Sequence, residues 1–379
     1  MHFDETATQK ELRELTRKFA QKELAPLVEE DEKAERFRPE IIKKLGELGL
    51  TGIPVPEAYG GAGLGYQEYA VVIEELAAVN TGYAVSVSVT GLPQVILNLF
   101  GNEEQKKKYI PPLASGQAIG SFSLSEPGAG SDAASLRTTA KKEGDHYILN
   151  GTKQWTTQAD SAQTILLMAR TGGPGPKGIS AFILSKGMPG LSFGKREKKM
   201  GIHTSHTMEV LLNNVHVPAA NLVGQEGDGF KIAMTALNSG RITIGAGALG
   251  LARAALDVAV RHAKTREQFG KPIVEFQGIS FMLADMATEL DAARLLVQRA
   301  AWLKDHGKPF ATEAAMAKFF ATDMAMKVTT DAVQVLGGSG YTQDFPVERY
   351  MREAKVMQIV EGTNQIQRMI IGRALTERQ

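Results

Sequence analysis

The sequence contains no cysteine among its 379 residues. This absence excludes a disulfide framework, a zinc or iron–sulfur site held by cysteine, and a catalytic thiol. An excess of charge of one sign is also missing, because 43 Lys and Arg residues are balanced by 42 Asp and Glu residues. A net charge of +1 argues against a protein that attracts nucleic acid through its overall field. We therefore expect a cytoplasmic protein with no nucleic-acid partner.

Long apolar runs are scarce as well. The stretch 81–100 is interrupted by Gly91, Pro93 and Asn98, so it falls short of the roughly 20 apolar residues that span a bilayer. Residues 1–30 are highly charged and lack the apolar segment of a signal peptide. We expect no membrane span. The 43% hydrophobic and 22% charged residues are typical of a globular protein, and the length favours two or three domains.

The spacing of apolar residues changes twice along the chain. Residues 1–120 show helical spacing, for example at Leu12, Leu15 and Phe19. Residues 121–225 contain short alternating or apolar runs between turn residues, which predict a small antiparallel β-domain. Residues 226–379 return to long amphipathic stretches joined by Gly and Pro turns, which are typical of a helix bundle. The predicted class is therefore α+β, in the order helical, β, helical.

Individual elements are predicted within the second and third domains. An Asn-Gly pair between two apolar runs predicts a β-hairpin of residues 146–149 and 152–157, with a type I′ turn at Asn150-Gly151. Three further strands are predicted, at residues 164–169, 180–184 and 208–212. The predicted long helices cover residues 230–265, 276–306 and 310–336.

One motif match points to a different function. Residues 245–250 fit the pattern G-x-G-x-x-G of dinucleotide-binding proteins. That motif needs a strand before it and a strand after the following helix, whereas both flanks here have helical spacing. We therefore interpret the small residues as a place where a neighbouring helix approaches closely, and we reject a nicotinamide-dependent dehydrogenase.

Two stretches of the β-domain have the chemistry of a binding site. Residues 121–132 form a turn-rich loop whose hydroxyls and main-chain N–H groups can bind an anion or the polar edge of a ring. Trp155, one of two tryptophans, is followed by Thr156 and Thr157, so it can stack on a flat ligand while a threonine donates a hydrogen bond. The alternatives are a plain connection for the loop and a core position for Trp155.

Two stretches of the helical C-terminal domain also stand out. Arg266 follows a long helix and precedes Gln268-Phe269-Gly270, where it can either satisfy the helix end or hold a pyrophosphate. Glu361 lies between the apolar pair Ile359-Val360 and Gly362, so partial desolvation can raise its pKa and suit it to general-base catalysis. The alternative for Glu361 is a solvated cap residue.

Taken together, these stretches resemble the acyl-CoA dehydrogenase family over almost the whole chain. The matches occur in the family's order: the loop E-P-G-A-G-S-D from Glu126, the segment W-T-T from Trp155, R-x-Q-F-G from Arg266, Q-V-L-G-G from Gln334 and E-G-T-N-Q-I from Glu361. Residues 200–205 add a likeness to short-chain, butyryl-type bacterial members. The resemblance implies that the C-terminal domain is a four-helix bundle and that the chain assembles as a homotetramer, a dimer of dimers.

The resemblance also implies roles for individual residues, with Glu361 as the catalytic base. One set is implied to bind FAD within the chain: Phe122, Leu124, Ser125, Gly130, Ser131, Trp155, Thr156, Thr157, Thr363, Asn364 and Gln365. A second set is implied to contact the FAD that a neighbouring subunit holds: Arg266, Gln277, Gln334, Val335, Leu336, Gly337 and Gly338. Phe269 is a further implied FAD contact. The implied substrate contacts are Ser131, Asn238, Ser239, Gly240, Arg241 and Gly362.

Three positions bear on what the family pattern implies. Most relatives have Asp at the position of Asn238, and many have Tyr or Phe at the position of Val360 beside the base. In some relatives the base is a Glu at the position of Gly240, so Glu361 has no rival here. The implied chemistry is α,β-dehydrogenation of an acyl-CoA in fatty acid β-oxidation: Glu361 removes the α-proton, and the β-hydrogen leaves as hydride to the flavin. Electron-transfer flavoprotein is the implied electron acceptor.

The expected substrate is a short linear acyl-CoA, with short branched chains as the alternative. An acyl-CoA oxidase shares the general site, but the polypeptide chains of these oxidases are longer than this one. A non-catalytic scaffold protein would be expected to lack the base. No metal is expected.

Overall fold

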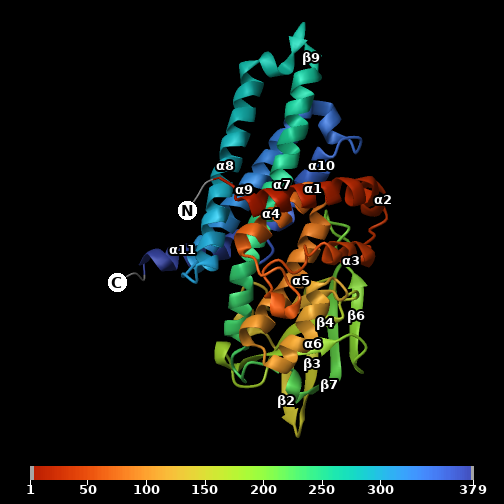
Figure 1. Cartoon of the computed structure of the whole chain (residues 1–379), viewed down its shortest axis with the longest axis vertical. Helices are drawn as coiled ribbons and strands as arrows, with labels where there is room; N and C mark the ends of the chain where they lie inside the picture. Colours follow the sequence, from red (N-terminus) through yellow and green to blue (C-terminus); the bar gives the residue numbers. More distant parts are fainter. Residues whose placement is uncertain (1–3, 377–379) are drawn as a thin grey trace.

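The computed structural model describes residues 4–376, so the outermost residues of the first and third predicted domains lie outside the described part. The order of elements is helical, then β, then helical, as the sequence predicts. Figure 1 shows an elongated molecule with the sheet at one end and the tip of a helix pair at the other.

The N-terminal region is a set of helices: α1 (Ala7–Phe19), α2 (Val28–Lys33), α3 (Pro39–Glu47), α4 (Tyr66–Ala77), α5 (Thr81–Phe100) and α6 (Glu103–Ala114). Side chains define their starts. Thr6 and Asn102 each form a capping box, and Asn80 accepts hydrogen bonds from the first N–H groups of α5. Because α5 is buried almost throughout, it forms the centre of this region.

Helix α5 corrects the sequence-based expectation of a broken stretch at residues 81–100. It runs through Pro93 as one helix of 20 residues. Among the described residues, α5 and α7 (Gly229–Thr265) are long and apolar enough to cross a membrane by length and composition alone. Their most apolar windows are 72% and 78% buried inside the chain, however, as expected for core helices.

The middle region is a sheet of eight strands: β1 (Gly120–Ser123), β2 (Thr139–Glu143), β3 (His146–Thr157), β4 (Thr164–Arg170), β5 (Ile179–Ser185), β6 (Leu191–Arg196), β7 (Thr207–Pro218) and β8 (Leu222–Val223). Most neighbours are antiparallel, but β1 and β2 each pair with β4 in parallel. The expectation of a purely antiparallel domain is therefore wrong in this respect, because β1 enters directly from the helical region.

The predicted hairpin with its turn at Asn150-Gly151 is also wrong. Strand β3 continues through both residues, and the chain reverses instead between β2 and β3 at Gly144 and Asp145. Asn150 exchanges side-chain and main-chain hydrogen bonds with Asn214 of β7 at a local bulge. A Cβ on Gly151 would lie 2.5 Å from the Oγ1 of Thr138, so this glycine allows close contact between segments rather than a turn.

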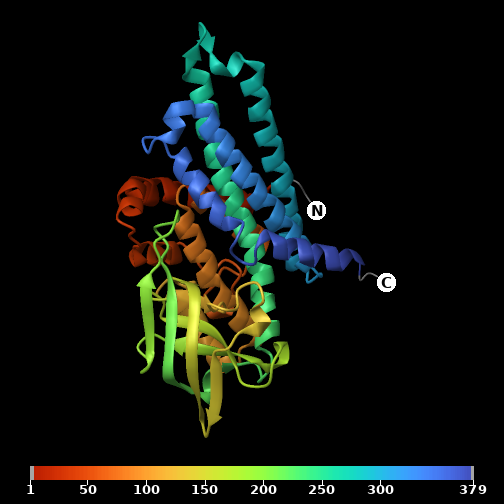
Figure 2. The same ribbon diagram turned by 180° about the vertical axis from the view of Figure 1, so that it is seen from behind.

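The C-terminal region contains α7 and the helices α8 (Gln277–Asp305), α9 (Ala311–Leu336), α10 (Val347–Met357) and α11 (Asn364–Thr376). Helices α7, α8, α9 and α10 pack together as the implied four-helix bundle, and α11 extends away from it (Figure 2). The three predicted long helices agree with α7, α8 and α9 to within about one residue at each end, because their apolar spacing persists over many turns.

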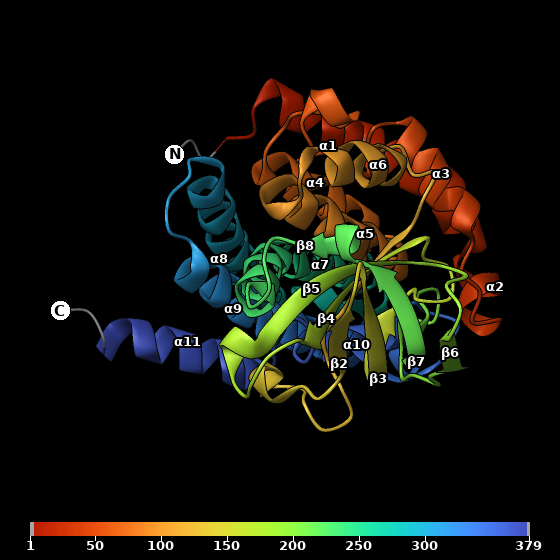
Figure 3. The same cartoon turned by 90° about the horizontal axis from the view of Figure 1, so that it is seen from below.

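Helix α7 connects all parts of the molecule. It packs on α4 and α5, on β4 and β5, and on the bundle helices α8 and α9 (Figure 3). Its Gly-rich segment makes this contact possible, since a Cβ on Gly250 would lie 2.1 Å from the carbonyl oxygen of Glu74 and one on Gly245 would lie 3.0 Å from Val297. The interpretation of residues 245–250 as a close helix contact is confirmed.

Candidate active site

A cavity of about 430 Å³ lies where the sheet, α7 and the α10–α11 turn meet. Its walls come from β1 and the loop that follows it (loop 121–134), from α5, from the end of β3, from the first turns of α7 and from residues 359–366. Of the predicted site residues, the following line this cavity: Phe122, Leu124, Ser125, Gly130, Ser131, Trp155, Thr157, Arg241, Glu361, Gly362 and Thr363. Three of the four motifs that the sequence places far apart thus meet around one space.

Glu361 lies in the turn between α10 and α11. Its φ of 56° and the φ of 87° at Gly362 are both left-handed, a conformation that is costly for a residue with a side chain. The turn is closed by the main-chain N–H of Asn364, which donates to the carbonyl of Gln358 at 3.0 Å. This geometry directs the Glu361 side chain back toward α7 instead of out to solvent.

The carboxylate of Glu361 is desolvated. Its Oε2 atom is buried and has no hydrogen-bond partner among the described residues. Burial raises the pKa of Glu361 to about 7, although the cations of Arg241 and Lys318 oppose the rise. The expectation of a desolvated carboxyl with a raised pKa agrees with this environment, and the alternative of a solvated cap residue does not. A carboxylate with a pKa near neutrality is suited to accepting a proton.

Gly240 provides the space for this carboxylate. A Cβ at Gly240 would lie 2.7 Å from the Oε2 of Glu361, closer than such contacts occur in folded proteins. The next residue, Arg241, is largely buried, and its NH1 donates to the Oδ1 of Asn238 at 2.6 Å. Asn238 therefore orients the guanidinium group of Arg241, the residue that follows Gly240. Ser239 faces elsewhere, because its hydroxyl donates to the carbonyl of Thr235 at 3.1 Å.

Trp155 forms part of the cavity wall while remaining 56% exposed, so the alternative of a core tryptophan is wrong. Its φ of 62° interrupts the pairing of β3 with β7 and turns the side chain out of the sheet. The neighbouring Thr156 is buried, and its hydroxyl lies 2.9 Å from that of Ser123, while Thr157 lines the cavity. The strand thus presents one flat ring and one hydroxyl to the cavity.

A buried ion pair supports the loop opposite Glu361. The Nζ of Lys153 donates to the carbonyl of Leu124 at 2.9 Å and to the carboxylate of Glu126 at 2.8 Å. Glu126 also accepts from the main-chain N–H groups of Arg137 and Thr138. Burial lowers the pKa of Lys153 to about 8. These bonds hold the cavity side of loop 121–134 in place, a role that the sequence did not suggest for either residue.

Thr363, Asn364 and Gln365 line a second cavity of about 300 Å³ together with Asp323, Lys355 and Arg368. Thr363 belongs to both cavities, so they adjoin at the start of α11. Asn364 is buried there and bonds to three residues of α9, namely Lys318, Thr322 and Asp323. The sequence motifs missed all three. The only signal in the sequence is that Lys318 directly follows the apolar, alanine-rich run 314–317 within the helix.

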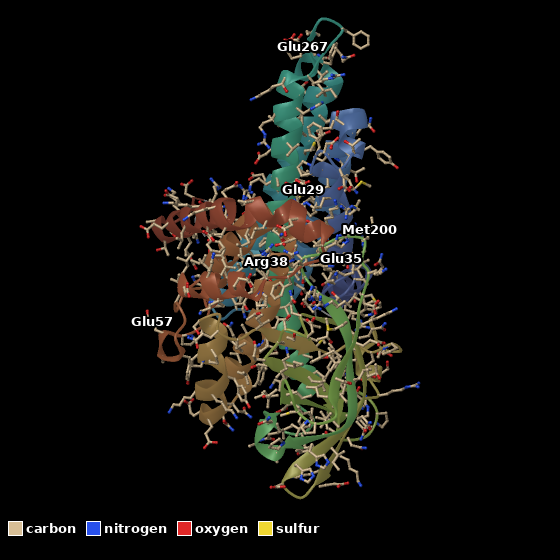
Figure 4. The ribbon with its side chains drawn as sticks, turned by 90° about the vertical axis from the view of Figure 1, so that its right-hand side faces the viewer. Glu29, Glu35, Arg38, Glu57, Met200 and Glu267 are labelled. Atoms are coloured by element: carbon tan, nitrogen blue, oxygen red, sulfur yellow. The ribbon has the colours of Figure 1, made fainter. Side chains whose placement is uncertain are left out.

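The remaining predicted FAD contacts lie outside both cavities of the chain. Arg266, Phe269 and Gln277 surround the tip of the α7–α8 pair, where Figure 4 shows Glu267 at the far end of the molecule. Phe269 is 94% exposed there. In the second segment, at the end of α9, Gln334, Gly337 and Gly338 are exposed while Val335 and Leu336 are buried. Within one chain these residues do not meet the others.

Three family models match the chain. They are "Acyl-CoA dehydrogenase, N-terminal domain" at residues 6–117, "Acyl-CoA dehydrogenase, middle domain" at residues 121–215 and "Acyl-CoA dehydrogenase, C-terminal domain" at residues 227–376. The chain belongs to the acyl-CoA dehydrogenase family. It is accordingly a flavin-dependent oxidoreductase, and the family and the three-part fold implied by the sequence are confirmed.

Individual acyl-CoA dehydrogenases and their structures are similar over the full length. An acyl-CoA dehydrogenase of Bacillus subtilis is 52% identical over 98% of each chain. The solved butyryl-CoA dehydrogenase of Megasphaera elsdenii is 47% identical, covers 99% of this chain and 100% of its own, and has a TM-score of 0.97. A chain in a structure titled for the electron transferring flavoprotein of Acidaminococcus fermentans is 51% identical over 100% of both chains, with a TM-score of 0.98.

Proposed function

We propose that this chain binds FAD and oxidises a short-chain acyl-CoA to the trans-2-enoyl-CoA, with Glu361 as the base that removes the α-proton. The observation that carries the proposal is the Oε2 of Glu361, a buried carboxylate oxygen without a partner among the described residues, in the wall of the cavity. Such an atom is costly to bury unless a ligand supplies a proton or a donor to it.

The cavity has the two kinds of wall that this reaction needs. Apolar side chains from α5, α7, the α10–α11 turn and α11 suit an acyl chain: Val89, Leu92, Phe230, Met234, Leu237, Val360 and Ile366. The opposite wall has Trp155 and the hydroxyls of Ser125 and Thr157, which suit a flat polar ring system. An acyl chain between these walls would lie beside Glu361.

The residues present fit FAD. Trp155 is held in a strained conformation that exposes its ring to the cavity, and the adjoining cavity at Thr363–Gln365 supplies the hydroxyl, amide and cationic groups that a diphosphate chain requires. When bound, FAD supplies the acceptor for the β-hydrogen and its electron pair. Glu361 would accept the α-proton, and its main-chain N–H would polarise the thioester carbonyl. Arg241 and Lys318 would favour the ionised form of Glu361 before the proton arrives.

A wide groove offers room for the rest of the substrate. It has a volume of about 730 Å³, runs between residues 132–137 and 170–175, and shares Asp132 and Ala134 with the cavity. Arg137 and Arg170 also line it. Because the groove opens from the cavity, a thioester bound at Glu361 can continue into it as CoA. Ser131 lines the cavity directly before the shared residue Asp132, which supports the predicted double contact with cofactor and substrate.

Relatives suggest the substrate and the partner. The name of the Megasphaera elsdenii structure supports butyryl-CoA or a similar short chain. The similar chain in the structure named for the electron transferring flavoprotein of Acidaminococcus fermentans supports electron-transfer flavoprotein as the electron acceptor. Fatty acid β-oxidation in the cytoplasm fits this chemistry. A homotetramer would bring Arg266 and residues 334–338, which line neither of the two cavities of their own chain, to the cofactor of a neighbouring subunit.

The test is the visible spectrum of the purified protein. It should be yellow with about one FAD per chain, and butyryl-CoA added without oxygen should bleach it. Rapid reoxidation by oxygen would indicate an acyl-CoA oxidase. Bound flavin that no acyl-CoA of four to eight carbons, linear or branched, can bleach would refute the proposed dehydrogenation.

A further inference from the structure

A lysine is buried in the core of the helix bundle. Lys318 of α9 has no exposed surface, although a buried ammonium group is unfavourable unless acceptors surround it. Its Nζ donates to the carbonyl of Gly362 at 3.1 Å and to the Oδ1 of Asn364 at 2.7 Å. Both acceptors belong to the segment that presents Glu361. The amino group of Lys318 is therefore directed from α9 at this turn.

The turn itself needs such support. Residues 361 and 362 both have left-handed φ values, and strained residues persist only where their surroundings over-determine them. The carbonyl of Glu361 accepts from the Nε2 of Gln367 at 3.2 Å and from the Nε of Arg241 at 3.4 Å. The carbonyl of Gly362 accepts from Gln367 at 2.7 Å and from Lys318. Gln367 comes from the adjacent α11 and Arg241 from α7, so Lys318 is the one of these three donors that comes from α9.

We propose that Lys318 is a positioning residue for Glu361: it fixes the 361–362 turn to α9 and, in its protonated form, places a cation near the buried carboxylate. The inference rests on the proposed role of Glu361 as the base. It assigns no contact with substrate or cofactor to Lys318, which lines neither the cavity at Glu361 nor the one at Thr363.

The charges around the pair agree with this role. Burial raises the pKa of Glu361 to about 7, and the cations of Arg241 on α7 and Lys318 on α9 limit the rise. Burial lowers the pKa of Lys318 to about 7; Glu361 and Asp323 oppose that change, and Arg241 adds to it. Tyr66 of α4 also faces Glu361, and burial raises its pKa. Each member of the pair therefore favours the charged form of the other.

This coupling predicts a shift in pH dependence. Glu361 must be ionised to accept a proton, so activity is present above its pKa and is lost as the pH falls through about 7. In Lys318→Met a side chain of similar length has no charge and no donor. The pKa of Glu361 should then rise, and the acid limb of kcat/KM should move upward by about one pH unit, the low end for loss of a nearby opposite charge.

The experiment measures the protonation of the Glu361 carboxyl directly, in addition to the rate of the reaction. The infrared C=O band of the protonated carboxyl, identified by its loss in Glu361→Gln, is titrated from about pH 5 to 9, on either side of the expected midpoint, in the FAD-loaded enzyme. The value of kcat/KM is measured over the same range. In Lys318→Met both midpoints should shift upward together. A role for Lys318 in stability alone would lower activity at every pH and leave both midpoints in place.

Lys327→Met is the matched control. It makes the same change on the same helix, but Lys327 is half-exposed and pairs with Glu289 and Asp331. It should leave both midpoints unchanged. If Lys318→Met does not fold, Lys318→Gln tests the same point, because its amide keeps a donor without a charge.

Two outcomes separate the claims. Neutral variants at Lys318 that fold, bind FAD and keep both midpoints unshifted would overturn the proposal. Full activity of Glu361→Gln would instead overturn Glu361 as the base, while the infrared midpoint would still report whether Lys318 acts on its carboxyl.

Discussion

Glu361 and Phe269 have nearly the same unusual backbone conformation in opposite surroundings. Their φ values are 56° and 53°, and each is followed by a glycine with positive φ. At Glu361 the turn is held by side chains from α7, α9 and α11, and a carboxylate oxygen is buried. At Phe269 the two-residue strands β9 (Glu267–Gln268) and β10 (Lys271–Pro272) close the turn, and the ring is 94% exposed.

The difference shows that one chain by itself completes the region around Glu361 and leaves the region around Phe269 exposed. The strain at Glu361 is stabilised within the chain and directs a carboxylate into a cavity. The strain at Phe269 presents an aromatic ring and the nearby Arg266 outward, and the described residues leave Phe269 94% exposed. We therefore expect the first region to act in chemistry and the second to act in assembly and cofactor retention.

The largest effect is expected from Glu361→Gln. The amide keeps the size of the side chain but removes its basicity, so the rate of flavin reduction by acyl-CoA should fall at least ~100-fold, the low end for general-base catalysis. Anaerobic stopped-flow at the flavin absorbance measures this rate. FAD content and oligomeric state should stay as in the unmodified enzyme. Normal reduction in this variant would remove the base from the proposed mechanism.

A smaller effect at the same region is expected from Gly240→Ala. The new Cβ would lie 2.7 Å from the Oε2 of Glu361 and would displace the carboxylate. A displacement of about 1 Å can cost on the order of 100-fold, so we expect a loss of roughly 10- to 100-fold in kcat with FAD retained. Gly278→Ala on α8 is the control, since its Cβ would meet nothing within 4 Å. Equal activity of the two variants would show that the absence of a side chain at Gly240 is not needed to place the carboxylate.

The exposed region is tested by Arg266→Ala. Loss of a charge-assisted hydrogen bond should weaken FAD retention about tenfold and lower thermal stability with it, because the cofactor stabilises the folded state. Flavin content after dialysis and the melting temperature measure the two effects. Lys264→Ala, which removes an exposed cation two residues away, should change neither. A monomer that sediments with one FAD per chain would contradict the proposed coupling between assembly and cofactor.

The smallest effect concerns the length of the acyl chain. We expect the highest kcat/KM with linear chains of about four to six carbons, and each methylene added or removed outside that range should change kcat/KM by about fourfold, the value of one buried methylene. Butyryl-, hexanoyl-, octanoyl-, isobutyryl- and isovaleryl-CoA are compared with one electron acceptor. Val360 lines the cavity where many relatives have an aromatic residue, so Val360→Phe should shift the preference toward shorter chains. A maximum at eight carbons or with a branched chain would change the substrate and leave the chemistry intact.

Long helices and the family motifs were the parts of the protein that the sequence could predict. Helix α7 begins at Gly229 and ends at Thr265, where its apolar spacing predicts residues 230–265, because a period that persists over many turns is hard to mistake. The rejection of a nucleotide motif at residues 245–250 is confirmed for the same reason. Short signals were weaker, and the Asn-Gly pair that favours a turn was overridden by the pairing of β3 with β7.

The sequence by itself determined the order helical, β, helical, the absence of thiol chemistry and the identity of Glu361 as a candidate base. Only the tertiary structure decided that Gly240 makes room for that carboxylate and that Lys318 supports its turn. These residues are distant in the chain, so no local pattern relates them. Burial, which sets the pKa of Glu361, arises only when α7, α9 and the α10–α11 turn exclude water together.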